Sequence, residues 1–186
     1  MNQSKKTGVK GKRISRSYCQ SIIAEPEKVF YLLCPSKHAI WHEFEGYETH
    51  LIYSETDFLE HGCVFSTHKT TPKGTEETIW ITTKYDKDNH VIEHVRFTPD
   101  SRVCIVNISV QPGDNRTSKV NITYTYTSIS EKGNQFIDSF TEPAFLGVVK
   151  FWEESMNYYL KKGKKLKFSD FLNTNKSNLI LSGDDE

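Results

Sequence analysis

Residues 22–42 read IIAEPEKVFYLLCPSKHAIWH and contain two short helical patterns in immediate succession. Pro26 suits the first turn of the first helix, which has acidic neighbours and an apolar stripe. Pro35 then stops that helix, and Ser36 can cap the second one. An alternating run at 12–24 comes directly before and predicts a strand. This order of one strand and two short helices, so early in the chain, decides the fold once the remaining elements are placed.

After Gly46 the chain alternates between polar and apolar residues, and turn-rich segments such as TPKGTE and PGDNRT interrupt the alternation. Six further strands are predicted, near residues 48–54, 63–70, 77–85, 90–98, 102–111 and 118–129. The loops between them are short, which indicates that successive strands are antiparallel neighbours in a meander.

The last part of the chain has a helical period, from Asn134 to Lys162, and Gly163 suits the C-terminal cap. Pro143 lacks the N–H that a helix interior needs, so we expect a first segment to residue 141 and a kink or break at 141–143. The long helix is the only element large enough to cover one apolar face of a seven-stranded sheet.

The predicted fold class is therefore α+β: a curved, seven-stranded antiparallel sheet wrapped around a long C-terminal helix. The first strand pairs with the last or with the second, and the two short helices close one end of the curl. We expect one domain at 13–168, a flexible basic tail at 1–12 and a flexible acidic tail at 169–186.

The composition argues against several classes of partner. Lys plus Arg and Asp plus Glu each total 24, so no net field attracts nucleic acid. The longest apolar run, AFLGVV, is too short to span a bilayer. The four cysteines form no CxxC pair, and a reducing cytoplasm is the expected location. The oligomeric state, monomer or homodimer, stays open.

Motifs for chemistry are scarce. His38 and His42 have the i, i+4 spacing of a shared metal site, but Ala39 stands where the zinc-protease pattern needs Glu. We therefore expect no metal, with one of these histidines exposed and the other at the rim of the sheet. Neither a GxSxG nucleophile nor a GxGxxG phosphate loop is present, and no cofactor is expected.

Strand register predicts which side chains face the helix. A tight turn at Pro99-Asp100 would place Phe97 opposite Arg102, and Glu93 opposite Val106. Val110 opposite Val120 aligns the apolar positions of the last two strands. The resulting inner face, with the helix that covers it, predicts a ligand site formed by Trp80, Thr82, Glu93, Val95, Val106, Ile108, Tyr124, Tyr126, Phe140, Val148 and Trp152.

One alternative stays open. If the loop at 86–89 shifts the register by one residue, Glu93 points to solvent and His94 faces inward in its place. In the predicted register, Glu93 is the main ionisable group of the site, with Tyr124 or Thr82 as its hydrogen-bond partner.

Three segments resemble a known family: IAEPEKVFYLLCPSKHAIWH, VRFTPDSRVCIVNISVQP and GNQFIDSFTEPAFLGVVKFWEESMNYYLKKGK. They are similar to the START-like (SRPBCC) superfamily of helix-grip proteins, which includes polyketide cyclases and birch-pollen-allergen-like proteins. The resemblance covers roughly residues 13–168. It implies a cavity between sheet and long helix, and it is specific for the fold but not for the chemistry.

The resemblance leaves three functions open. The first is a carrier or sensor for a small hydrophobic molecule, aromatic or lipid-like. The second is an enzyme of the cyclase, aromatase or dehydratase type, with Glu93 as acid-base residue and Tyr124 orienting the substrate. The third is a protein-interaction module like the chaperone activators of this superfamily. The first segment of the long helix and the helix at 36–41 are expected to act as a gate to the cavity.

Overall fold

The computed structural model describes residues 9–43, 46–71 and 74–175. Seven strands form one antiparallel sheet in the order β1-β7-β6-β5-β4-β3-β2. Their bounds are β1 Arg13–Ile22, β2 Tyr47–Tyr53, β3 Val64–Thr71, β4 Gly74–Asp86, β5 Val91–Thr98, β6 Arg102–Pro112 and β7 Ser118–Ser128. The five helices of the described ranges are α1 Pro26–Leu32, α2 Pro35–Trp41, α3 Glu131–Ser139, α4 Glu142–Lys162 and α5 Phe168–Asn175.

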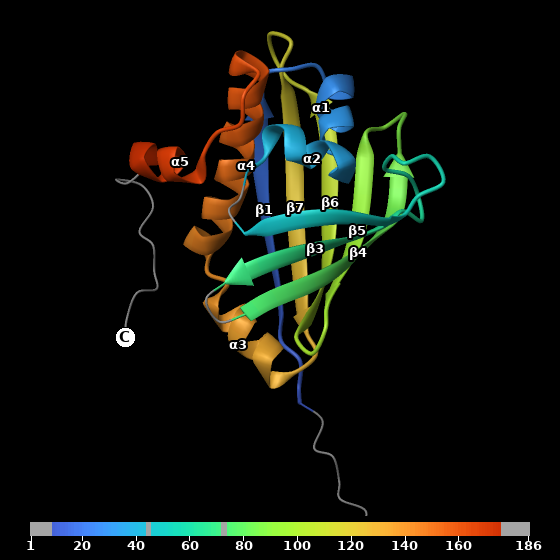
Figure 1. The fold of residues 1–186 in the computed structure, drawn as a ribbon, viewed down its shortest axis with the longest axis vertical. Helices are drawn as coiled ribbons and strands as arrows, with labels where there is room; N and C mark the ends of the chain where they lie inside the picture. Colours follow the sequence, from blue (N-terminus) through green and yellow to red (C-terminus); the bar gives the residue numbers. More distant parts are fainter. Residues whose placement is uncertain (1–8, 44–45, 72–73, 176–186) are drawn as a thin grey trace, which may run out of the picture.

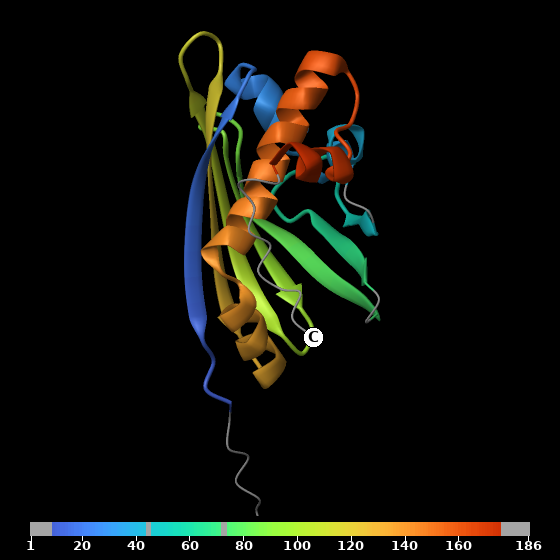
Figure 2. The ribbon, with the colours of Figure 1, turned by 90° about the vertical axis from the view of Figure 1, so that its left-hand side faces the viewer.

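The sheet is a meander closed by its first strand. Each of β2 to β7 pairs with its successor, and β1 pairs with β7 along its whole length. Strands β1 and β2 therefore occupy opposite edges, with α1 and α2 bridging the distance between them (Figure 1). Figure 2 shows the sheet curving around α3 and α4, which lie on its concave side. The predicted strands, their order and the fold class are confirmed.

The two short helices begin at prolines. Pro26 and Pro35 each stand at the first position, where the missing N–H has no intrahelical partner to lose. Cys34, and not Ser36 as predicted, is the N-cap residue of α2. Trp41 fixes the pair: its side chain is fully buried, and its indole N–H donates to the carbonyl of Leu32 at 2.8 Å.

The predicted break in the long helix is confirmed. α3 ends at Ser139 and α4 begins at Glu142, with Pro143 in the first turn of α4. Thr141 caps α4 by accepting a hydrogen bond from the backbone N–H of Ala144 at 3.4 Å. α4 ends at the left-handed Gly163, which has a φ of 66°.

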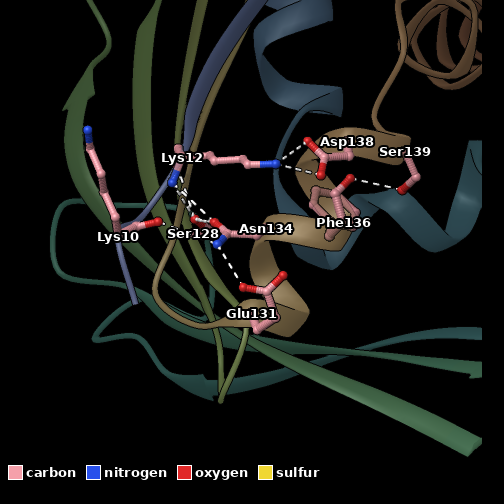
Figure 3. A network of polar contacts seen from close by, with 8 residues as sticks. All are labelled: Lys10, Lys12, Ser128, Glu131, Asn134, Phe136, Asp138 and Ser139. Atoms are coloured by element: carbon pink, nitrogen blue, oxygen red, sulfur yellow. Dashed lines mark hydrogen bonds and ion pairs between the residues drawn. The ribbon is translucent and has the colours of Figure 1, made fainter. Parts of the chain in front are cut away.

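α3 begins three residues before the predicted Asn134 because Ser130 caps it, accepting from the N–H of Gly133. Its first turn is tied to the start of the chain (Figure 3). The Asn134 side chain accepts from the N–H of Lys12 at 3.2 Å, and the Lys12 ammonium pairs with Asp138 at 2.6 Å. Lys12, the last residue of the flexible basic tail predicted at 1–12, is therefore held against α3, whereas residues 1–8 lie outside the described residues.

In the part of the chain predicted as a flexible C-terminal tail, residues 169–175 belong to the helix α5. Phe171 is buried there, and its ring centroid lies 5.1 Å from that of Phe151 on α4. Only two turns of helix carry this contact, too few for a periodic signal in the sequence. Residues 176–186 lie outside the described residues.

The predicted register between β5 and β6 is wrong by one residue. Thr98, not Phe97, pairs with Arg102, because the turn has three residues and Asp100 adopts a left-handed conformation with a φ of 55°. A one-residue shift exchanges the two faces of a strand, so every inward position of β5 changes. The pairing of Val110 with Val120 is confirmed. No helix within the described ranges is both long and apolar enough to cross a membrane.

Candidate functional site

A cavity of about 330 Å³ lies between the sheet and the helices α3 and α4, with α2 at its side. Half of its sixteen lining residues are aromatic. These are Tyr47, Trp80, Tyr124, Tyr126, Phe136, Phe140, Phe145 and Trp152. Its other lining residues are His38, His42, Lys69, Arg96, Arg102, Ser139, Ala144 and Val148.

The aromatic side chains form one connected wall. The Tyr126 ring meets that of Phe140 edge-on at 4.8 Å between centroids, and the Tyr124 ring meets that of Phe145 at 5.9 Å. These edge-to-face pairs connect β7 to the helical layer, because Phe140 lies in the break between α3 and α4 and Phe145 lies on α4. Burial raises the pKa of both the Tyr124 and the Tyr126 hydroxyl, so both stay protonated and able to donate a hydrogen bond.

α2 and its C-cap residue contribute two histidines, His38 and His42, to the wall, which corrects the expectation that one would be exposed and the other at the rim. The rings of His38 and His42 lie 5.6 and 5.9 Å from the Trp152 ring. Desolvation lowers the pKa of His38 to about 4 and that of His42 to about 3, so both imidazoles are neutral at pH 7. The described residues contain no cluster of three or more His, Cys, Asp or Glu able to hold a metal ion.

Two arginines from neighbouring strands enter the cavity wall in different ways. Arg102 is buried, and its guanidinium pairs with both carboxylate oxygens of Glu76 at 2.6 and 3.1 Å. Arg96 lies with its guanidinium carbon 4.5 Å from the Trp80 ring centroid and donates to the Tyr126 hydroxyl at 3.2 Å. The Arg96 Nε is buried and has no hydrogen-bond partner among the described residues.

Six of the predicted site residues line this cavity: Trp80, Tyr124, Tyr126, Phe140, Val148 and Trp152. Val106 and Ile108 lie beside it, around an adjoining void of about 20 Å³ that Trp80 and Trp152 also line. Thr82 faces the same side and is buried, with its hydroxyl 3.2 Å from Nδ1 of His94.

The other two predicted residues, Glu93 and Val95, lie on the outer face of the sheet. The Glu93 carboxylate accepts a hydrogen bond from the exposed Thr83 hydroxyl at 2.8 Å. His94 faces inward instead, opposite Val106, as the alternative register predicted. It is 5% exposed, and desolvation lowers its pKa to about 3. The structure therefore does not bring Glu93 to Tyr124.

The sequence reasoning missed the cationic residues of the wall, Lys69, Arg96 and Arg102. Arg96 would have been found from the alternative register, because strand alternation places it on the face of His94. The sequence gives no such signal for Lys69, His38 or His42, since the orientation of these side chains depends on how far β2, β3 and α2 bend toward the cavity.

No protein-family model and no curated protein matches the sequence. Solved structures do resemble the fold. An aromatase/cyclase, Zhui, from a Streptomyces species matches with a TM-score of 0.61 at 8% identity, over 83% of this chain and 100% of that one. The protein Ara h 8.0201 matches with a TM-score of 0.59 at 9% identity, over 81% and 99%.

Norcoclaurine synthase from Thalictrum flavum matches with a TM-score of 0.59 at 10% identity, over 87% of this chain and 94% of that one. Identities this low carry information on the fold alone. Together with the curved seven-stranded sheet and its broken C-terminal helix, they show that this chain has the helix-grip fold of the START-like (SRPBCC) proteins.

Proposed function

We propose that this protein binds a small hydrophobic molecule, aromatic or lipid-like, in the cavity between the sheet and α4, as a carrier or sensor. The observation that supports it is the cavity itself: about 330 Å³ of space, half of whose lining residues are aromatic. Ligand sites in proteins fall in the range of roughly 300–1,000 Å³ and are mostly apolar. Folded interiors otherwise leave few voids larger than a water molecule.

The geometry favours binding over the two alternatives. The acid-base residue of the enzyme hypothesis, Glu93, lies on the outer face, and none of the described residues lining the cavity is Asp or Glu. The interaction-module hypothesis expects a filled core, whereas a cavity of about 330 Å³ lies between this sheet and its helices. The four cysteines form no disulfide, in keeping with the proposed cytoplasmic location.

A neutral dye tests the proposal. N-phenyl-1-naphthylamine gains fluorescence in apolar surroundings and should bind the wild-type protein at one site. Val148→Trp should weaken this binding, because Val148 lines the cavity and a larger side chain there occupies part of its space. Lys150→Trp is the matched control, since Lys150 is exposed on the same helix and does not line the cavity. Undiminished binding by Val148→Trp would contradict the proposed site.

A further inference from the structure

Arg96 is the arginine of the cavity wall that has no acidic partner among the described residues, whereas Arg102 is paired with Glu76. The Arg96 guanidinium stacks on the Trp80 ring, and the guanidinium carbon lies 5.7 Å from the centroid of the Tyr126 ring. Two aromatic rings therefore lie next to the charged group. Within the described residues it makes a single hydrogen bond, to the Tyr126 hydroxyl, and no ion pair. A guanidinium has five N–H donors, and buried ones are ordinarily paired with an acid.

Arg102, on the neighbouring strand β6, is the paired arginine of the same cavity wall. It too stacks on an aromatic ring, with its guanidinium carbon 3.7 Å from the Phe136 centroid, but it donates two hydrogen bonds to the Glu76 carboxylate, which neutralises its charge. Both carboxylate oxygens of Glu76 are thereby paired with Arg102. The described lining residues offer no second carboxylate for Arg96, so the positive charge at this wall is uncompensated.

The histidines of the cavity do not change this balance. His38 and His42 face the same space, and both are neutral at pH 7 because burial lowers their pKa values. An apolar cavity with a net positive wall, in a chain whose formal net charge is zero, is a specific feature and not a general basicity of the protein.

From this arrangement we infer that the bound molecule is an amphipathic acid: an aromatic or apolar body with one carboxylate-like or sulfonate-like group that pairs with Arg96. The acid completes the hydrogen bonding of the guanidinium, which is pre-oriented by Trp80 and Tyr126. The apolar body lies against Phe140, Phe145 and Trp152. This inference rests on the proposed function and adds the charge of the ligand to it.

Two dyes that differ only in an acid group test the inference. 8-Anilino-1-naphthalenesulfonate has the same ring body as N-phenyl-1-naphthylamine and carries one sulfonate in addition. We expect wild-type protein to bind the sulfonate dye at least tenfold more tightly, with one site by calorimetric titration. Arg96→Met should remove that advantage, so that the ratio of the two dye affinities measured in this variant falls to about one.

Arg116→Met is the matched control, because Arg116 lies in the turn between β6 and β7, has an 87% exposed side chain paired with Glu25, and does not line the cavity. It should leave both affinities unchanged. Equal affinity of wild-type protein for the two dyes would overturn the inference and leave the proposed function standing. An undiminished advantage of the sulfonate dye in a folded Arg96→Met protein would overturn it as well.

Failure of the wild-type protein to bind either dye would instead contradict the proposed function, and with it the inference. Should Arg96→Met lose its near-ultraviolet circular dichroism, the comparison of the two dyes on wild-type protein still decides. Arg96→Lys is then the second variant: it keeps the charge but not the planar fork, and it should retain part of the preference for the sulfonate dye.

Discussion

Acid should destabilise this protein through His94. The imidazole is 5% exposed, bonds to Thr82 and meets the Phe65 and Trp80 rings edge-on at 5.6 and 5.8 Å. Desolvation lowers its pKa from the ordinary 6.5 to about 3. Between these two values the unfolded chain binds a proton that the folded protein does not. The contribution of His94 to stability is therefore complete above pH 6.5 and is lost as the pH falls below it.

The size of the stability loss at pH 5 depends mainly on how far the His94 imidazole is protonated in the unfolded chain. At this pH the folded imidazole is still neutral, while roughly 97% of unfolded imidazoles are protonated, which lowers the free energy of unfolding by about 2 kcal/mol relative to pH 8. A folded-state pKa of 4 instead of about 3 would hardly change this figure. His38 and His42 act in the same direction, because their pKa values are also lowered.

Urea unfolding at pH 8 and pH 5 measures the effect. His94→Asn keeps a polar atom near Thr82 but cannot titrate, so its stability should fall by about 2 kcal/mol less than that of the wild type over this interval. Thr82→Val is the matched control: it breaks the same hydrogen bond but retains the imidazole, and should show the full wild-type loss. Equal losses for His94→Asn and the wild type would refute the reasoning.

Three further outcomes are expected. Gly133→Ala should destabilise the protein by about 2 kcal/mol or more in urea unfolding, because the new Cβ would lie 1.9 Å from the carbonyl oxygen of Ser101; an unchanged midpoint would contradict this contact. Glu93→Gln should change stability by less than about 0.5 kcal/mol and leave dye binding as it is, since the carboxylate lies on the outer face. Hydrogen exchange should show α3 and α2 opening well before residues 148–160 of α4, and equal protection would exclude a gate formed by these two helices.

The elements of the fold are readable from the sequence because each has a local cause. Pro26 and Pro35 start the short helices, Pro143 separates α3 from α4, and Gly163 ends α4. Alternation predicts all seven strands, and short loops predict the meander. The covering helix follows from the need to bury one face of the sheet.

Which side chains of β5 face inward depends on whether the turn between β5 and β6 has two or three residues. Local sequence patterns do not determine this turn length. A two-residue and a three-residue turn fit the same letters at 99–101, and only the left-handed conformation of Asp100 selects the longer one. An irregularity between Thr82 and Lys84 shifts the other side of β5 as well. The sequence therefore places Glu93 on the inward face of β5, where the structure has His94 and Arg96. The predicted site contains an acid, whereas the observed cavity wall contains a cation.

The pairing of β1 with β7 has a consequence for how the chain folds. Arg13 lies opposite Thr127, and Lys12 bonds to Asn134 across 122 residues, so the first strand finds its partner only after nearly the whole sheet has been made. During synthesis β1 therefore emerges long before β7 and has no partner strand until β7 is made. Closing so long a loop costs conformational entropy before the contacts between β1 and β7 form, so we expect their pairing to be a slow step of folding.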